Sequence, residues 1–135
     1  MSNKRLALVA ILVPEYDAGI DFFVNTLGFS LLQDTPLSDT KRWVRVGYPG
    51  HGTEFLIARA VGGQRAAIGA QGGGRVWLFL ETDDFHGDYA QMIAKGVHFE
   101  TPPRDEPYGK VAVFNDPFGN RWDLIQFTRS DRAHQ

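Results

Sequence analysis

The chain has 135 residues, of which 43% are apolar and 22% charged, and its formal net charge is −2. This length and composition indicate one folded domain that can bury its own core, and they argue against a disordered chain. The sequence contains no cysteine, which excludes disulfide frameworks, thiolate nucleophiles and cysteine-bound zinc. A metal site would have to be built from His, Asp or Glu side chains.

Two classes of partner are not expected. Sequence-independent binding of nucleic acid needs several Lys or Arg side chains on one surface, and the sequence has no such cluster. The longest apolar run, residues 6–14, is much shorter than the roughly 20 residues of a membrane-spanning helix. Because no secretory signal opens the chain, we expect a cytoplasmic protein that binds neither nucleic acid nor a membrane.

The first half of the chain predicts a strand, a helix and three further strands. Residues 6–13 are continuously aliphatic and precede Pro14, as in a central strand covered on both faces. Asp17 can cap a helix whose apolar residues recur with helical spacing as far as Leu27, and Gly28 can end it. The three later strands, which turns rich in Pro, Gly and Asp separate, are predicted over 29–32, 42–48 and 53–59.

A glycine-rich segment, residues 60–74, separates this half from the next. It lacks a clear period and predicts a mobile linker, with one short helical turn near 65–68. If it ordered over a ligand, it would act as a lid. The elements predicted beyond it are a strand over 75–81, a helix that Asp83 or Asp84 caps, and strands over 97–100, 110–114 and 121–127.

The order of elements in the two halves indicates an internal duplication. The glycines that end the two predicted helices, Gly28 and Gly96, are 68 residues apart. We therefore predict one α+β domain of two βαβββ modules, over about 5–59 and 75–128, with a polar tail at 129–135. One such module cannot cover the concave face of its own sheet. Two modules are therefore expected to form a curved, mixed, eight-stranded sheet around a cavity, with the helices outside.

Several motifs are similar to those of a known family. The first module contains Val13-Pro14-Glu15-Tyr16-Asp17, Phe22-Phe23 and Leu27-Gly28-Phe29. The second contains Glu81-Thr82-Asp83-Asp84-Phe85, Lys95-Gly96-Val97 and the turn Asn115-Asp116-Pro117-Phe118-Gly119-Asn120. In this order they resemble the vicinal-oxygen-chelate superfamily of glyoxalases, bleomycin resistance proteins and extradiol dioxygenases. The resemblance covers residues 6–127 and implies the glyoxalase/bleomycin resistance fold.

Metal-dependent members of this superfamily hold a divalent cation with four side chains, from the first and last strands of both modules. The resemblance places Leu8 and Trp77 at the first-strand positions, and neither side chain is a metal ligand. The last-strand positions fall on Asp123 in the second module and on Glu54 or Leu56 in the first. Even a catalytic zinc-like site normally has three protein ligands plus water, and at best two carboxylates remain here, so we expect no metal cofactor. One divalent ion bound by Glu54 and Asp123 is the alternative.

The histidines do not supply the missing ligands, because no two of them have the i, i+4 spacing of a helical pair. All four are expected at the surface: His51, His86, His98 and His134.

The residues expected to line the cavity are mostly apolar or aromatic, with a few charges. They are Leu8, Trp43, Arg45, Glu54, Leu56, Trp77, Phe79 and Asp123, together with Tyr108 from a Pro/Gly loop at the cavity mouth. This set resembles the metal-free, bleomycin-resistance type of the superfamily, in which aromatic rings and acidic groups enclose a drug. A tryptophan face can stack on a flat ring or a cation. The leading hypothesis is therefore that the protein binds a small aromatic or cationic molecule.

Several alternatives stay open. Trp77 and Phe79 are alternatively core residues, and Asp123 is either a catalytic acid or base, an ion-pair partner of Arg45 or a contact for a cationic ligand. The other functions are a divalent-metal lyase, isomerase or dioxygenase, similar to lactoylglutathione lyase, and an interaction module without a ligand. Because members of the superfamily usually pair, we expect a homodimer.

Overall fold

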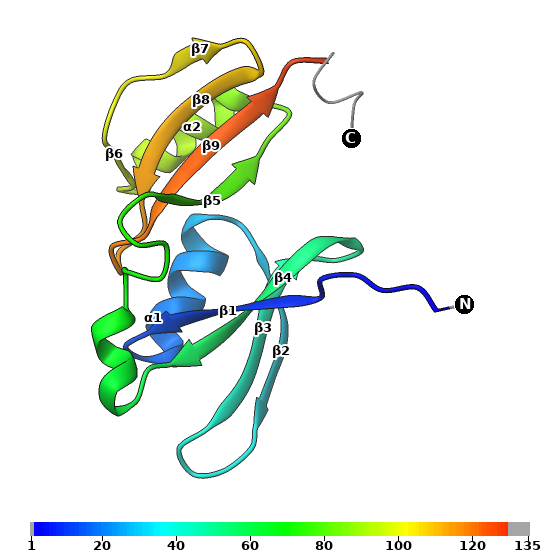
Figure 1. Ribbon diagram of the computed structural model, residues 1–135, viewed down its shortest axis with the longest axis vertical. Coiled ribbons are helices and arrows are strands. Elements are labelled where there is room, and N and C mark those ends of the chain that lie inside the picture. The colour runs from blue at the N-terminus through cyan, green and yellow to red at the C-terminus, as the bar shows by residue number, and fades with distance from the viewer. Residues whose placement is uncertain (1, 130–135) are drawn as a thin grey trace. The chain divides into compact units, whose positions relative to one another are not determined.

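The computed structural model describes residues 2–129, except the side chain of His51. The chain divides into two compact units, Met1–Ile68 and Gly69–Gln135, each built around one mixed β-sheet (Figure 1). The division falls inside the predicted linker and separates the two predicted modules. The α+β class and the repeated module are therefore confirmed.

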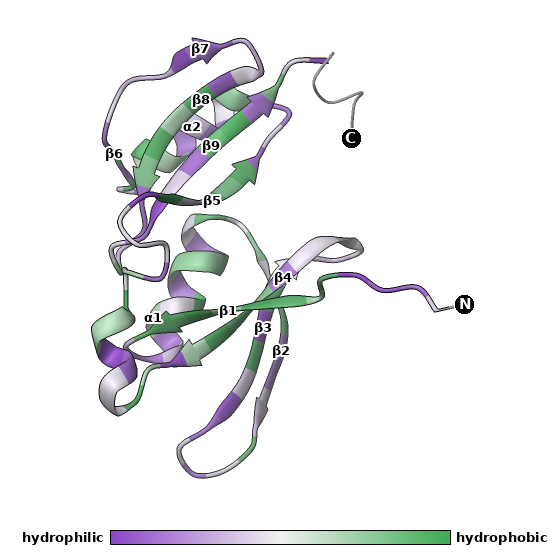
Figure 2. Cartoon of the chain, in the orientation of Figure 1, coloured by the Kyte–Doolittle hydropathy of each residue, from purple (hydrophilic) through white to green (hydrophobic). Residues whose placement is uncertain are grey.

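The sheet of the first unit has four strands in the order β1-β4-β3-β2. They are β1 (Leu8–Val13), β2 (Ser30–Pro36), β3 (Arg42–Tyr48) and β4 (His51–Arg59). β1 runs parallel to β4, whereas β3 is antiparallel to both of its neighbours. β1 is almost wholly hydrophobic (Figure 2), but it stands at the end of this order, and only Ile11 and Val13 on it are completely buried. Within this unit, β1 is therefore not the central strand that its aliphatic run predicted.

The helix of the first unit changes its winding halfway along. α1 (Tyr16–Ile20) continues directly into a π-helical segment, η1 (Asp21–Thr26), in which the N–H of Leu27 donates to the carbonyl of Phe22 at 3.0 Å. Asp17 lies in the first turn, and Glu15 occupies the cap position without a side-chain hydrogen bond, so the predicted cap is corrected. The helix ends before Gly28, whose φ of +81° suits glycine.

The sheet of the second unit has five strands in the order β5-β9-β8-β6, with β7 also pairing with β8. They are β5 (Val76–Glu81), β6 (His98–Phe99), β7 (Arg104–Glu106), β8 (Gly109–Asn115) and β9 (Arg121–Phe127). α2 (Phe85–Ala94) follows β5, and its cap is Asp84, which accepts a hydrogen bond from the N–H of Gly87 at 3.2 Å. β5 runs parallel to β9, as β1 does to β4.

Two details differ from the sequence-based expectation. The described residues form nine strands, in one sheet of four and one of five, whereas the sequence predicted eight strands in one sheet. The additional strand is Arg104–Glu106, which pairs with β8. Its charged residues, with prolines on either side, show none of the apolar alternation that marks a strand. The linker also contains a longer helical segment than expected, the 3-10 helix η2 (Gly62–Ala67). No helix between residues 2 and 129 is long and apolar enough to cross a membrane.

A buried carboxylate organises the turn between β8 and β9. Asp116 is 4% exposed and accepts hydrogen bonds from the backbone N–H groups of Phe118 and Asn120, at 3.0 and 2.9 Å. It also accepts from Asn120 Nδ2 at 2.9 Å and from Trp122 Nε1 at 3.0 Å. Gly119 in this turn has a φ of +110°, which suits glycine. Trp122 is 2% exposed and therefore belongs to the core.

Replacing this carboxylate is expected to destabilise the protein. Asp116→Asn turns one acceptor oxygen into a donor that faces other donors, so we expect a loss of about 2 to 4 kcal/mol in the free energy of unfolding. Urea denaturation followed by circular dichroism measures it. Asp105→Asn is the matched control, because Asp105 pairs with Lys110 at an exposed site and should cost less than about 1 kcal/mol. Equal losses in the two variants would contradict the role assigned to Asp116.

Candidate ligand-binding site

One face of the first sheet carries all five of the cavity residues predicted from the first module. In the ladder, Leu8 is opposite Glu54, and Leu56 is opposite Arg45. Residues opposite each other in a ladder project to the same face, and Trp43 joins them because it precedes Arg45 by two positions. The residues that alternate with them, Ile11, Val13, Val44, Val46 and Ile57, form the buried face beneath α1. The five predicted residues therefore lie on the face opposite the helix.

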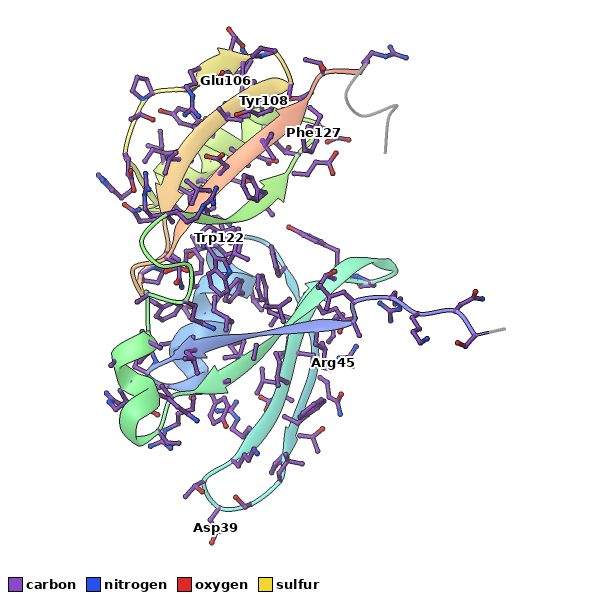
Figure 3. The ribbon with its side chains drawn as sticks, in the orientation of Figure 1. Asp39, Arg45, Glu106, Tyr108, Trp122 and Phe127 are labelled. Carbon is purple, nitrogen blue, oxygen red and sulfur yellow. The ribbon has the colours of Figure 1, made fainter. Side chains whose placement is uncertain are left out.

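The charges on this face neutralise each other. Arg45 (labelled in Figure 3) donates from Nε to Glu54 Oε1 at 2.8 Å, and its Nη2 lies 2.8 Å from the same oxygen. Nη1 of Arg45 donates to Gln33 Oε1 at 3.1 Å. The two charged side chains are 29% and 16% exposed. Arg45, predicted as a partner of Asp123, is thus bound by Glu54 and Gln33.

The second sheet also has a face opposite its helix, and there Asp123 lies between Phe79 and Val113. Asp123 is opposite Phe79 on β5 and opposite Val113 on β8, so the three side chains project together. Phe79 is 59% exposed, whereas Asp123 and Val113 are 6% and 7% exposed. A phenyl ring accessible to solvent therefore stands beside a buried carboxylate.

The carboxylate of Asp123 lacks a complete set of partners. Its Oδ1 is buried and accepts no hydrogen bond from the described residues. Burial raises the pKa of Asp123, and the positive charges of Arg104 and Arg121 offset part of this effect. Both arginines are already paired, Arg104 with Glu106 at 2.7 Å and Arg121 with Glu100 at 2.8 Å. Asp123 is thus a charged group that a donor from outside the protein would stabilise.

Two predicted site residues of the second unit, Trp77 and Tyr108, do not lie on a regular stretch of strand. Trp77 falls at a β-bulge, where the register between β5 and β9 shifts, and it packs so closely against Gly72 that a Cβ there would collide with it. Tyr108 lies in the turn between β7 and β8, and its carbonyl accepts a hydrogen bond from the N–H of Thr128 at 2.9 Å. Figure 3 shows Tyr108 near Glu106 and Phe127, at the end of the β8–β9 ladder remote from the turn after β8.

A pocket of about 350 Å³ opens in the first unit near Trp43. Besides Trp43 and Leu56, which the sequence predicted, its walls come from the turn before β3, the end of β4 and the start of η2. The residues that line it are Tyr16, Thr40, Lys41, Arg42, Trp43, Leu56, Ile57, Ala58, Arg59, Val61 and Gln64. Strand alternation alone misses most of these residues, because they lie in turns or at strand ends.

The donor set does not fit the metal centre of the metal-dependent relatives. Between residues 2 and 129, no three His, Cys, Asp or Glu side chains are grouped as a metal would require. Leu8 and Trp77 offer no ligand atom, and Oε1 of Glu54 is occupied by Arg45. His86 and His98 are exposed, while the side chain of His51 and all of His134 lie outside the described part. The absence of a metal cofactor stays a prediction.

The raised pKa of Asp123 makes stability depend on pH. The folded chain holds this proton more tightly than the unfolded chain, so stability should fall as pH rises from the ordinary value of 3.8 through the raised one. Asp123→Asn removes this titration. It should therefore be more stable than the wild type at neutral pH, and equally stable below the ordinary value. Urea unfolding at a series of pH values measures this, and a constant difference across the series would contradict it.

Comparison with known proteins agrees with the fold. The family model of the Glyoxalase/Bleomycin resistance protein/Dioxygenase superfamily matches residues 5–124. An uncharacterized protein of Shewanella frigidimarina (strain NCIMB 400) is 50% identical over 127 residues, which are 92% of this chain and 94% of that protein.

Two solved structures from Streptomyces sp. CB03234 are similar. TnmS3, an antibiotic binding protein, is 30% identical with a TM-score of 0.75, and the match covers 95% of this chain and 99% of that one. A glyoxalase/bleomycin resistance protein is 32% identical with a TM-score of 0.69, covering 90% and 100%. The chain belongs to the glyoxalase/bleomycin resistance protein/dioxygenase superfamily, as its motifs predicted.

Proposed function

We propose that this protein binds a small organic molecule that carries an aromatic ring and a cationic or hydrogen-bond-donating group, without a metal ion. The observation that carries this proposal is the buried Oδ1 of Asp123, which accepts no hydrogen bond from the described residues. A desolvated carboxylate oxygen without a donor is costly, and native structures rarely keep one without a purpose. A ligand ammonium or N–H group would satisfy it.

The neighbour of Asp123 favours an aromatic ligand. Phe79, directly opposite it, is 59% exposed, and an exposed ring of this size gains free energy when a flat apolar partner covers it. The combination of a ring and a carboxylate is suited to a planar aromatic cation, which stacks through its face and donates through its edge. The similarity to TnmS3, an antibiotic binding protein, supports a small organic molecule as the ligand.

Binding of proflavine, a planar aromatic cation, tests this proposal. Titration followed by proflavine fluorescence should give saturable binding to the wild type. Asp123→Asn keeps the shape but removes the charge, and should weaken the affinity about tenfold, the equivalent of roughly 1.4 kcal/mol. Phe79→Ala should weaken it as well, because the stacking surface is lost.

The control for these variants is Asp105→Asn, which removes one carboxylate at an exposed position on β7. It should bind proflavine as the wild type does. An equal effect of Asp105→Asn and Asp123→Asn would show that proflavine binds through the general surface charge of the protein and not through Asp123. Failure of the wild type to bind proflavine or any other planar cation would refute the proposed ligand class.

The proposal also requires function without a metal. Metal analysis of protein purified without chelator should find no stoichiometric metal, because Glu54 is neutralised by Arg45 and the first strands offer no ligand. Stoichiometric nickel, zinc, iron or manganese would instead favour a lyase, isomerase or dioxygenase.

We further propose that the protein is a cytoplasmic homodimer. Exposed apolar side chains outside the candidate site, including Leu31, Leu37 and Ile93, provide surface that a second copy would cover. Size-exclusion chromatography with light scattering should report the mass of two chains, and the mass of one chain at micromolar concentration would refute the dimer.

A further inference from the structure

The pocket near Trp43 has chemistry opposite to that around Asp123. We call it the Lys41 pocket and define it by the lining residues given above. Its volume of about 350 Å³ falls within the roughly 300 to 1,000 Å³ of small-molecule sites. Its lining includes three basic side chains, Lys41, Arg42 and Arg59, and no Asp or Glu. The pocket is therefore suited to an acidic ligand if its positive charges are not already neutralised.

Arg42 is neutralised. Its guanidinium lies 2.9 Å from Asp17 Oδ1 and 2.7 Å from Asp34 Oδ2, and it stacks over the ring of Tyr16 with 5.2 Å between its Cζ and the ring centroid. The hydrogen bonds from Arg42 hold the pKa of Asp34 below its ordinary value. Arg42 thus shapes the wall of the pocket instead of offering a charge to a ligand.

Lys41 and Arg59 keep donors available. Among residues 2–129, no hydrogen bond or ion pair involves the ammonium group of Lys41, and Arg59 uses only Nε, which lies 3.3 Å from Glu15 Oε2. The backbone of Lys41 is fixed by the turn, because its N–H donates to Ser38 Oγ at 3.1 Å and its carbonyl accepts from the N–H of Leu37 at 2.8 Å. Lys41 therefore enters the pocket from a fixed point.

The nearest acidic side chain of this turn, Asp39, does not line the pocket. Figure 3 shows it at the tip of the hairpin between β2 and β3, pointing away from the strands. It lines only a neighbouring, more open hollow of about 290 Å³ that shares Lys41 but not Trp43. The ammonium group of Lys41 is accordingly the uncompensated charge at the mouth of the pocket.

The remaining walls are apolar. Trp43 is half-buried, and Leu56, Ala58 and Val61, which is 53% exposed, also line the pocket. A tryptophan face and an aliphatic wall together accept a flat ring. We propose that the Lys41 pocket binds a planar aromatic carboxylate, with the ring against Trp43 and the carboxylate on Lys41 and the Nη groups of Arg59. This goes beyond the proposed function, because the pocket lies in the other unit and selects the opposite charge.

Fluorine NMR of protein labelled with 5-fluorotryptophan tests the proposal with residue resolution. The chain has three tryptophans, and Trp43→Phe and Trp77→Phe assign their resonances. Naphthalene-2-carboxylate should shift the Trp43 resonance and leave those of Trp77 and Trp122 in place. The neutral analogue naphthalene-2-carboxamide should bind at least about fivefold more weakly, because it has no negative charge to pair with Lys41 and Arg59.

Lys41→Gln, at an exposed position, should weaken naphthalene-2-carboxylate by at least about fivefold, and Lys4→Gln is the control that removes the same charge elsewhere. Equal affinities for the carboxylate and the carboxamide, equal effects of the two lysine variants, or a shift at Trp77 or Trp122 instead of Trp43 would each overturn the proposal. So would the absence of any shift at millimolar ligand. Proflavine binding at Asp123 is measured in a separate experiment. Failure of the proposal for the Lys41 pocket would therefore not refute the proposed function, and the reverse also holds.

Discussion

The register of β9 between β5 and β8 determines the surroundings of Asp123. It places the carboxylate of Asp123 between Phe79 and Val113, where Oδ1 is withdrawn from water and has no donor among the described residues. A slip of one residue would turn Asp123 toward α2 and expose Trp122 on the other face. The hydrogen bond from Trp122 Nε1 to Asp116 opposes such a slip, since it fixes the face of β9 that is buried.

Two buried aspartates in the second unit show how structural and functional carboxylates differ. Asp116 and Asp123 are 4% and 6% exposed, so both lose most of their hydration. Asp116 compensates for this loss with hydrogen bonds from four donors, three in its own turn and one from Trp122 at the start of β9. Asp123 has only the fields of Arg104 and Arg121, each engaged by another carboxylate. Burial of Asp116 thus serves the fold, whereas burial of Asp123 lowers stability without a compensating hydrogen bond to Oδ1, which supports the proposed ligand contact.

Sequence periodicity was sufficient for the module, for the strand-helix order and for the shared face of Leu8, Arg45 and Glu54, because side-chain direction in a strand repeats every two residues. It was not sufficient where structure departs from that period. The bulge at Trp77 and the short strand Arg104–Glu106 do not follow the regular alternation of apolar and polar residues along a strand, so periodicity could not predict them. The partner of Arg45 could not be predicted either, because Glu54 and Asp123 are equally acidic and only the ladder between β3 and β4 brings Glu54 beside it.

The candidate sites of the two units have unpaired groups of opposite charge, although the units repeat one architecture. In the first, the acidic residue of the open face is neutralised by Arg45, and the ammonium group of Lys41, which lines the pocket beside Trp43, keeps no partner among the described residues. In the second, the carboxylate oxygen that keeps no donor among the described residues is Oδ1 of Asp123. An uncompensated charge beside an exposed or half-buried ring has the features of a binding site in both places, since the ring supplies free energy that is largely non-directional and the charge supplies selectivity. The two proposals together therefore give the repeated modules of one chain two sites of opposite charge preference.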